Sequence, residues 1–293
     1  MVTSKGRPIV LIRHVQSNKK SKLRGSESIK LARQRLLEDN GNRRFLIEKR
    51  LEAVAFVLEN SLLEGLEVGS GPGATRLLFP SANLLSTDIQ KYDWIQVADV
   101  DACALPFVDE SFDYLYVPNV LHHINNPWQF FSEASRVLRP GGQLFVQDVN
   151  TSLAMRWLLK ITNHESYDTT VDAMDPRYRI QRGDDKSPWA TNCDISRQFF
   201  SRPYEFHQSF PALRIVRDEF HECLTFLNSG GMIVDTPKVP LPQSLLRRVW
   251  ALDEWLCRLA PSLFSLQRFT VLAKIHESEG STTSHEPETG IDR

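Results

Sequence analysis

The fold is decided by the stretch Leu66-Glu67-Val68-Gly69-Ser70-Gly71-Pro72-Gly73-Ala74-Thr75-Arg76. Apolar residues lead into this stretch and follow it, which predicts a buried strand, a tight turn and the first turn of a helix. The glycines at 69, 71 and 73 allow a positive φ and let a ligand approach the backbone closely. The N–H groups at the start of the following helix can bind a polar ligand. We therefore predict a ligand-binding turn between a strand and a helix.

The spacing of the glycines separates this turn from the dinucleotide-binding fingerprint. The third glycine comes early, and Pro72 interrupts the pattern. Glycines this close together also occur in ordinary turns between a strand and a helix, so the turn alone is weak evidence for a binding site. The interpretation depends on the motifs that follow it.

Four further motifs follow the turn in order. The first is the apolar run 84–88, which ends in Asp88 about twenty residues after Glu67, where an acid can accept hydrogen bonds from both hydroxyls of a ribose. The second motif is Asp101-Ala102-Cys103-Ala104-Leu105-Pro106-Phe107. The third is Asn119-Val120-Leu121-His122-His123, which follows a predicted strand at 112–117. The fourth is Val137-Leu138-Arg139-Pro140-Gly141-Gly142, which precedes a predicted strand at 143–149.

In this order the motifs resemble those of the S-adenosylmethionine-dependent methyltransferases of the Rossmann-like, small-molecule type. The resemblance covers residues 45–150, with a closing strand expected near 269–275. It implies an α/β fold with a Rossmann-like, seven-stranded sheet that is mostly parallel and has an antiparallel last strand. N-terminal helices would precede the sheet, and an insertion would separate strands five and six.

The resemblance also implies the cofactor S-adenosyl-L-methionine and the residues that bind it. Its methionine part would be held by Glu67, Gly69, Gly71 and Gly73, its ribose by Asp88, its adenine by Asp101 and Ala102, and its sulfonium end would face Asn119 and His122. A helix at the N-terminal side would close the pocket, with Phe45 and Arg50 as candidates. The residue chemistry agrees, because carboxylates suit hydroxyls, an amine and a cation, whereas they repel phosphate.

Candidates for a catalytic base come from the ends of the fourth and fifth strands and from the insertion. They are His122, His123, Asp148, His164 and Asp168. We favour His123 or His164 as the catalytic residue, because imidazole titrates near neutral pH. The resemblance implies that one of the two adjacent histidines only shapes the pocket. The sequence has no H-x-x-E or paired-carboxylate spacing, so no metal is expected.

The chain has 293 residues, enough for one large α/β domain with an insertion. Its formal net charge of −1 argues against a protein that works mainly by gripping nucleic acid. Its four cysteines are scattered singly, which argues against a zinc site or a disulfide framework and favours the reducing cytoplasm. The N-terminus has no apolar segment typical of a signal peptide.

The chain divides into six predicted parts. These are a basic mobile arm at 1–25, N-terminal helices at 26–60 separated by Gly41-Asn42, the cofactor-binding core at 61–150, a lid or substrate insertion at 151–212, a C-terminal part with an amphipathic helix at 213–276, and a disordered tail at 277–293. The aromatic residues of the insertion suit either stacking on a substrate or packing against the core, and the sequence leaves both open.

The amphipathic helix at 243–264 carries Trp250 and Trp255 among leucines and arginines. Such a face can lie in a membrane interface, pack on the insertion or form a dimer face, and packing is the most frequent of these outcomes. The sequence leaves the oligomeric state open.

These features predict a methyltransferase that uses S-adenosylmethionine to methylate a hydroxyl of a small-molecule or glycan acceptor. The glycan follows from a looser resemblance of the whole chain to methyltransferases of bacterial glycan and lipopolysaccharide assembly. The alternatives are a lipid, natural-product or RNA methyltransferase and a cofactor-binding module without catalysis. The basic N-terminus is the only feature that favours RNA, and the intact acids Glu67, Asp88 and Asp101 count against the module.

Overall fold

The computed structural model describes residues 26–39, 41–162, 165–180, 191–233 and 236–275. The predicted arm at 1–25, the predicted tail at 277–293 and His164 lie outside the described residues. Both the arm and the tail therefore stay predictions.

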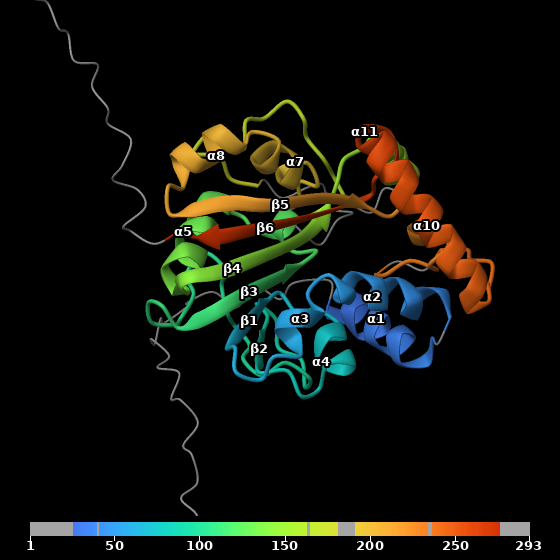
Figure 1. The fold of residues 1–293 in the computed structure, drawn as a ribbon, viewed down its shortest axis with the longest axis horizontal. Coiled ribbons are helices and arrows are strands. Elements are labelled where there is room, and N and C mark those ends of the chain that lie inside the picture. The colour runs from blue at the N-terminus through green and yellow to red at the C-terminus, as the bar shows by residue number, and fades with distance from the viewer. Residues whose placement is uncertain (1–25, 40, 163–164, 181–190, 234–235, 276–293) are drawn as a thin grey trace, which may run out of the picture.

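A six-stranded sheet with the order β2-β1-β3-β4-β6-β5 forms the centre of the described chain (Figure 1). Its strands are β1 (Gly65–Val68), β2 (Leu84–Thr87), β3 (Phe112–Pro118), β4 (Leu138–Val149), β5 (Leu213–His221) and β6 (Gln267–Lys274). Strands β1 to β4 pair in parallel, whereas β6 runs antiparallel to both of its neighbours, β4 and β5. The predicted α/β class and the antiparallel last strand are confirmed.

One of the seven expected strands, which would lie between β2 and β3 in the sequence, is reduced to a single bridge in the described chain. Val97 lies beside Thr87 in parallel, and its N–H and carbonyl bond to Ser86 and Asp88 at the edge of β2. The pairing stops at Asp99, which has a left-handed backbone with φ of 61°. A strand needs extended residues on both sides of a pair, so this one cannot continue. The predicted count of seven strands was therefore wrong by one.

Helices surround the sheet on both faces. They are α1 (Ser26–Glu38), α2 (Asn42–Glu52), α3 (Ala55–Leu58), α4 (Ala74–Leu78), α5 (Pro127–Val137), α6 (Leu153–Thr162), α7 (Ile195–Phe200), α8 (Pro203–Ser209), α9 (Leu224–Leu227), α10 (Gln243–Leu259) and α11 (Pro261–Phe264), with a 3-10 turn η1 (Leu121–His123). As predicted, α1 ends before Gly41 and α2 begins at Asn42. None of the described helices combines the length and the apolar character that crossing a bilayer requires.

The alternation of side chains along β3 divides the core between the two faces of the sheet. Leu115 and Val117 pack with the helices α5, α7 and α8 on one face. Tyr114 and Tyr116 pack with α2 and α3 on the other face. This is the period-two pattern of a strand that is covered on both sides.

The α7–α8 part of the insertion is held to the core by aromatic residues. The rings of Phe199, Phe206 and Phe210 surround Phe131 of α5 at centroid distances of 5.1 to 5.2 Å. Phe199 and Phe206 are fully buried. For these residues the structure supports packing rather than stacking on a substrate. The role of the insertion as a lid stays a prediction.

Helix α10 lies with α2 beyond the end of the sheet where β3 and β4 finish (Figure 1). Trp250 packs edge-on against Phe45 of α2 at 6.4 Å and stacks on His221 at 6.3 Å. Trp255, on the same helix, is 58% exposed. Trp250 is therefore partly covered by its neighbours, and Trp255 is the more exposed of the two tryptophans.

This difference gives a matched pair of variants. We expect Trp250→Ala to lower the free energy of unfolding by about 1.5–2.5 kcal/mol, roughly half the cost for a fully buried aromatic residue. Trp255→Ala should change it by less than about 0.5 kcal/mol, as is usual for exposed sites. Urea denaturation followed by circular dichroism measures both values. Equal losses in the two variants would contradict the packing described for Trp250.

Candidate active site

The predicted cofactor residues gather where the parallel strands end. The glycine-rich turn follows β1, Asp88 follows β2 and Asn119 follows β3. The carboxyl ends of parallel strands are the usual ligand-binding edge of an open α/β sheet. The turn also touches the third of these segments, since a Cβ placed on Gly69 would lie 2.5 Å from Val120. The structure therefore brings the glycine turn next to the segment that leads to His122.

The glycine turn leaves room for a ligand at its centre. Gly69, Gly71 and Gly73 have φ values of 72°, 49° and 71°, a region that favours glycine. A Cβ placed on Gly71 would meet nothing within 4 Å. The open space beside Gly71 is what a ligand that approaches the backbone would need.

Glu67 has a buried carboxylate with one oxygen available. The Thr75 hydroxyl donates a hydrogen bond to Oε1, whereas Oε2 is buried and has no hydrogen-bond partner among the described residues. Burial raises the pKa of Glu67 to about 7. A buried carboxylate oxygen without a partner is costly, and a ligand ammonium group would satisfy it. The methionine part of S-adenosylmethionine carries such a group, so Glu67 fits the predicted cofactor.

Asp88 connects the glycine turn with the end of β2. Its Oδ2 accepts from the Gly71 N–H at 2.9 Å and its Oδ1 from the Gln90 N–H at 2.8 Å. Burial raises the pKa of this carboxyl. Each carboxylate oxygen can accept a second hydrogen bond, so Asp88 can still bind the two hydroxyls of a ribose while it holds the turn.

Two side chains that the sequence analysis missed lie over the glycine turn. The Trp94 indole donates to the Gly71 carbonyl at 2.9 Å, and Arg33 of α1 donates to the Pro72 carbonyl at 2.8 Å. The Arg33 guanidinium lies 4.7 Å from the centre of the Trp94 ring. Helix α1 is thereby attached to the turn. No motif marks either residue, because both act through backbone carbonyls that any sequence provides.

The predicted adenine contacts, Asp101 and Ala102, lie in the loop after the bridge at Val97. Asp101 is exposed, and its Oδ1 accepts from the Cys103 N–H at 2.8 Å. This bond shapes the loop, and the role of the two residues in binding adenine stays a prediction.

Asn119 has a left-handed backbone with φ of 51°. Its Oδ1 accepts from Gln267 at 3.0 Å, and Gln267 in turn accepts from Arg50 at 3.3 Å. Arg50 forms a buried, two-pronged ion pair with Glu222 at 2.7 and 2.6 Å. Arg50 therefore fixes α2 to the sheet through Glu222. Its expected place over the cofactor stays a prediction.

Three side chains form what we call the His–Glu cluster: His122 and His123 of η1, and Glu165 after α6. The Nε2 atoms of His122 and His123 each lie 3.6 Å from an oxygen of Glu165, one on Oε2 and the other on Oε1. The two imidazole rings are 4.1 Å apart. Glu165 is a residue that sequence reasoning missed, because it lies in a polar stretch 42 positions after His123 and no spacing rule connects them.

The first histidine of the cluster is held on both sides. Its Nδ1 contacts Asp148 at the end of β4, and the Asp148 carboxylate also accepts from the His122 backbone N–H at 3.1 Å. Burial lowers the pKa of His122, but the charges of Asp148 and Glu165 outweigh this effect and raise it to about 10. Where no other cation lies beside these carboxylates, His122 is thus held as a cation near neutral pH. The expectation that one histidine of the pair only shapes the pocket stays a prediction.

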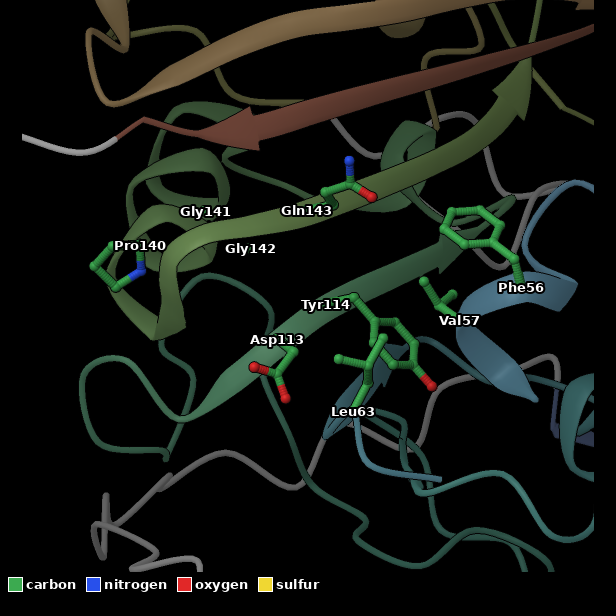
Figure 2. Close-up of a pocket in the computed structure, with 9 residues that line it drawn as sticks. All are labelled: Phe56, Val57, Leu63, Asp113, Tyr114, Pro140, Gly141, Gly142 and Gln143. Atoms are coloured by element: carbon green, nitrogen blue, oxygen red, sulfur yellow. The ribbon is translucent and has the colours of Figure 1, made fainter. Parts of the chain in front are cut away.

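A cavity of the described chain lies elsewhere. It has a volume of about 270 Å³ and is lined by Phe56 and Val57 of α3, Tyr114 of β3 and the first residues of β4 (Figure 2). Figure 2 shows Pro140 and Gly141 at the start of β4, which is the amino end of that parallel strand. The predicted site residues gather at the opposite edge, so this cavity is separate from the candidate site.

The comparison with protein families identifies the central part of the chain. Residues 66–146 match a family described as a methyltransferase domain. The segment contains the glycine turn, Asp88 and both histidines of η1. This segment therefore matches a methyltransferase domain, as the sequence predicted.

Individual proteins support the same class. A 27-O-demethylrifamycin SV methyltransferase from Amycolatopsis mediterranei is 34% identical over 101 residues, which are 28% of this chain and 37% of that protein. A ubiquinone/menaquinone biosynthesis C-methyltransferase from Roseobacter denitrificans is 43% identical over 54 residues, or 18% of this chain and 20% of that protein. The matched part thus spans little more than a third of the first relative's own length.

A solved structure supports the fold. The crystal structure of a SAM-dependent methyltransferase from Thermotoga maritima, described as a possible histamine N-methyltransferase, superposes with a TM-score of 0.51. It covers 85% of this chain and 97% of that one at 16% identity, which shows the shared fold. The predicted fold class is confirmed, and the predicted methyltransferase family and its cofactor are supported by the match over residues 66–146.

We expect S-adenosylmethionine to bind the protein more tightly as the pH rises from about 5.5 to about 7. Below a pKa of about 7, Glu67 is protonated in the ligand-free protein and must lose its proton to pair with the cofactor's ammonium group. The dissociation constant should therefore fall by up to about tenfold per pH unit. Glu67→Gln should bind more weakly and without this slope. Calorimetry at several pH values checks this, and an unchanged slope in Glu67→Gln would contradict it.

A second variant tests the ribose contact. Asp88→Ala should weaken cofactor binding by about 1–3 kcal/mol, because two hydroxyls lose a charged acceptor. Asp175→Ala is the matched control, since Asp175 pairs with Arg177 in a surface loop. Preferential binding of a nicotinamide dinucleotide would overturn the assignment of the cofactor.

Proposed function

We propose that the protein is a methyltransferase that transfers the methyl group of S-adenosylmethionine to a hydroxyl of a small-molecule or glycan acceptor. One observation carries the proposal: two groups lie at the same edge of the sheet. They are the buried Glu67 oxygen, which can still accept a hydrogen bond from a ligand, and the His–Glu cluster. Val120, which contacts the glycine turn, lies two residues before His122. One end of this edge can hold the cofactor while the other end receives the acceptor.

The chain's own residues would then divide the work as follows. The bound cofactor supplies a methyl group that its sulfonium has already activated. Glu67 and Asp88 hold the cofactor, and the acceptor must lie in line with the methyl group. A hydroxyl acceptor must also lose its proton. His123 is the member of the pair that an acceptor can reach, because its side chain is 22% exposed and that of His122 is 3% exposed.

His164 was the other predicted base, and it lies outside the described residues. It stays a candidate beside His123. The choice of oxygen as the methylated atom is also part of the proposal. The relatives do not agree on this atom, since one is named as a C-methyltransferase and another is named for an O-demethylated compound. The histidine pair favours an oxygen acceptor, because a hydroxyl needs a base to remove its proton. A neutral amine, or a carbon whose proton is already acidic, needs such a base less.

The test is a transfer assay with S-adenosylmethionine that carries an isotopic label in its methyl group. Hydroxylated small molecules, glycan extracts, lipid extracts and RNA serve as acceptors. We expect label in the small molecules or glycans, in a product that resists alkali as a methyl ether does. Label in RNA or in lipid alone would contradict the proposed acceptor. Cofactor binding without turnover on any acceptor would favour the non-catalytic module.

A variant tests the role of His123. His123→Ala should lower the turnover number by about 10²–10⁴-fold, the usual contribution of a general base, with the cofactor's dissociation constant unchanged. His207→Ala is the control, because His207 is an exposed histidine on α8. Full turnover in His123→Ala would exclude it as the base.

We also propose contact with an anionic membrane and a cytoplasmic location. The membrane contact is supported by exposed apolar residues on two helices that both pack on α11, among them Trp157 of α6, 66% exposed, and Trp255 of α10. The cytoplasm is supported by the four cysteines, all of which are described and have free thiols.

Vesicles of anionic lipid test the membrane contact. Trp255→Ala should reduce co-sedimentation with the vesicles, because an interfacial tryptophan loses its insertion. Tyr204→Ala should leave it unchanged, since Tyr204 is an even more exposed aromatic residue, on α8. Added salt should weaken binding to the vesicles, because it screens the attraction between the arginines of the helix and the anionic lipid. Equal effects of the two variants would contradict this surface.

A further inference from the structure

The His–Glu cluster has the composition of a metal site. Its three members can each present one ligand atom, and these atoms lie within 4.8 Å of one another. The two histidines are adjacent in the chain, and Glu165 comes from a separate segment after α6. Two imidazoles and one carboxylate form the protein ligand set of many catalytic zinc sites and of non-haem iron sites.

The spacing of the cluster suits an ion between its members. Each Nε2 lies 3.6 Å from a different oxygen of Glu165. Two donors that each bind a zinc ion at about 2.1 Å would lie roughly 3.4–3.7 Å apart at tetrahedral or slightly wider angles. The two histidine-to-carboxylate separations are therefore those of ligands around a small ion, and the three ligand atoms, which lie within 4.8 Å of one another, would have to draw together around it.

The surroundings of His122 hold its ring in the orientation that a metal ligand needs. Asp148 contacts Nδ1, so that Nε2 points toward Glu165. Asp148 is itself fixed, because it accepts from the Ser196 hydroxyl at 2.8 Å. A carboxylate behind a histidine is the usual outer partner of a metal-binding imidazole, since it fixes the tautomer and the ring plane.

The charges point the same way. Asp148 is buried and the Glu165 side chain is only 15% exposed, so two carboxylates share a region with little water. Such a region stabilises a cation. Without a metal, the protonated His122 ring supplies that charge, and a divalent ion would replace the proton on its Nε2. Three protein ligands would also leave one position of the ion open for water or another oxygen ligand.

We propose that His122, His123 and Glu165 bind one divalent transition-metal ion, with zinc as the reference ion. Binding of the ion does not depend on the proposed function. Its consequence for methylation does rest on that function: an oxygen of the acceptor would take the open position, and His123 would then hold the ion rather than take a proton.

The experiment measures zinc binding to the full chain without an affinity tag, after dialysis against a chelator. No cofactor and no acceptor is present. Isothermal titration should give one zinc ion per chain, and mass spectrometry of the metal content should give the same ratio. Cobalt, which is coloured, should bind at the same stoichiometry. It should show intense visible absorption bands, as expected for an ion with a low coordination number.

Variants then locate the ion. His123→Ala and Glu165→Ala each remove one ligand and should weaken zinc binding by at least the roughly 10–100-fold that loss of an outer partner costs. His207→Ala should bind as the wild type does, because this exposed histidine lies on α8. Both lost ligands are partly exposed, so circular dichroism should show folded variants.

Two results would overturn the proposal. One is a wild-type protein that binds no zinc at stoichiometric concentrations, a result that requires no variant. The other is zinc binding that stays unchanged in both His123→Ala and Glu165→Ala. Neither result affects the proposed function, which is tested by methyl transfer. Conversely, a protein that binds zinc at the cluster and transfers no methyl group would contradict the proposed function alone.

Discussion

The carboxylate of Asp148 is the contact on which the position of the His–Glu cluster depends. It reaches the ring and the backbone of His122 on η1 and the hydroxyl of Ser196 on α7, so it joins the end of β4 to two separate segments. Because this carboxylate is buried, each of these hydrogen-bond partners also offsets part of the free-energy cost of removing it from water. Loss of the partners would leave an uncompensated charge, which explains why three segments converge on one side chain.

A second buried charge organises the neighbouring end of the sheet. Arg50 and Glu222 pair inside the protein, and Gln267 connects Arg50 to Asn119 after β3. The chain thus uses two buried ionic contacts at the carboxyl edge. Removal of one partner from a buried pair is far more costly than loss of a surface pair. This edge is therefore rigid on both sides of η1, which suits a site that must align two reactants.

Much of the fold could be predicted from local sequence, because its signals lie in neighbouring residues. The glycines at 69, 71 and 73, the apolar run before Asp88 and the break at Gly41-Asn42 each identify an element without reference to the rest of the chain. The missing strand was not predictable in this way. An apolar Val97 permits a strand, and only the left-handed backbone of Asp99 ends it.

The site could be predicted only where its residues belong to motifs. Glu67, Asp88 and the two histidines do, and the structure brings them to one edge. Glu165 meets the histidines through the path of the chain after α6, and Arg33 meets the turn through the position of α1. Such contacts depend on tertiary packing, and composition or spacing carries no trace of them. Trp250 shows the same limit, since periodicity placed it on a face but did not say what covered that face.

The glycines of the turn are required for two different reasons, one that concerns a ligand and one that concerns the protein's own packing. Gly71 faces open space, whereas a Cβ on Gly73 would lie 2.8 Å from the Trp94 ring and 3.0 Å from Arg33. Gly71 is thus required by the left-handed backbone and by whatever approaches it, but Gly73 is also required by the protein's own packing. A search that counts glycines weighs the two equally. A related chain could keep Gly73 to accommodate its tryptophan long after it had ceased to bind a cofactor, so the glycine most informative about ligand binding is the one with nothing beside it.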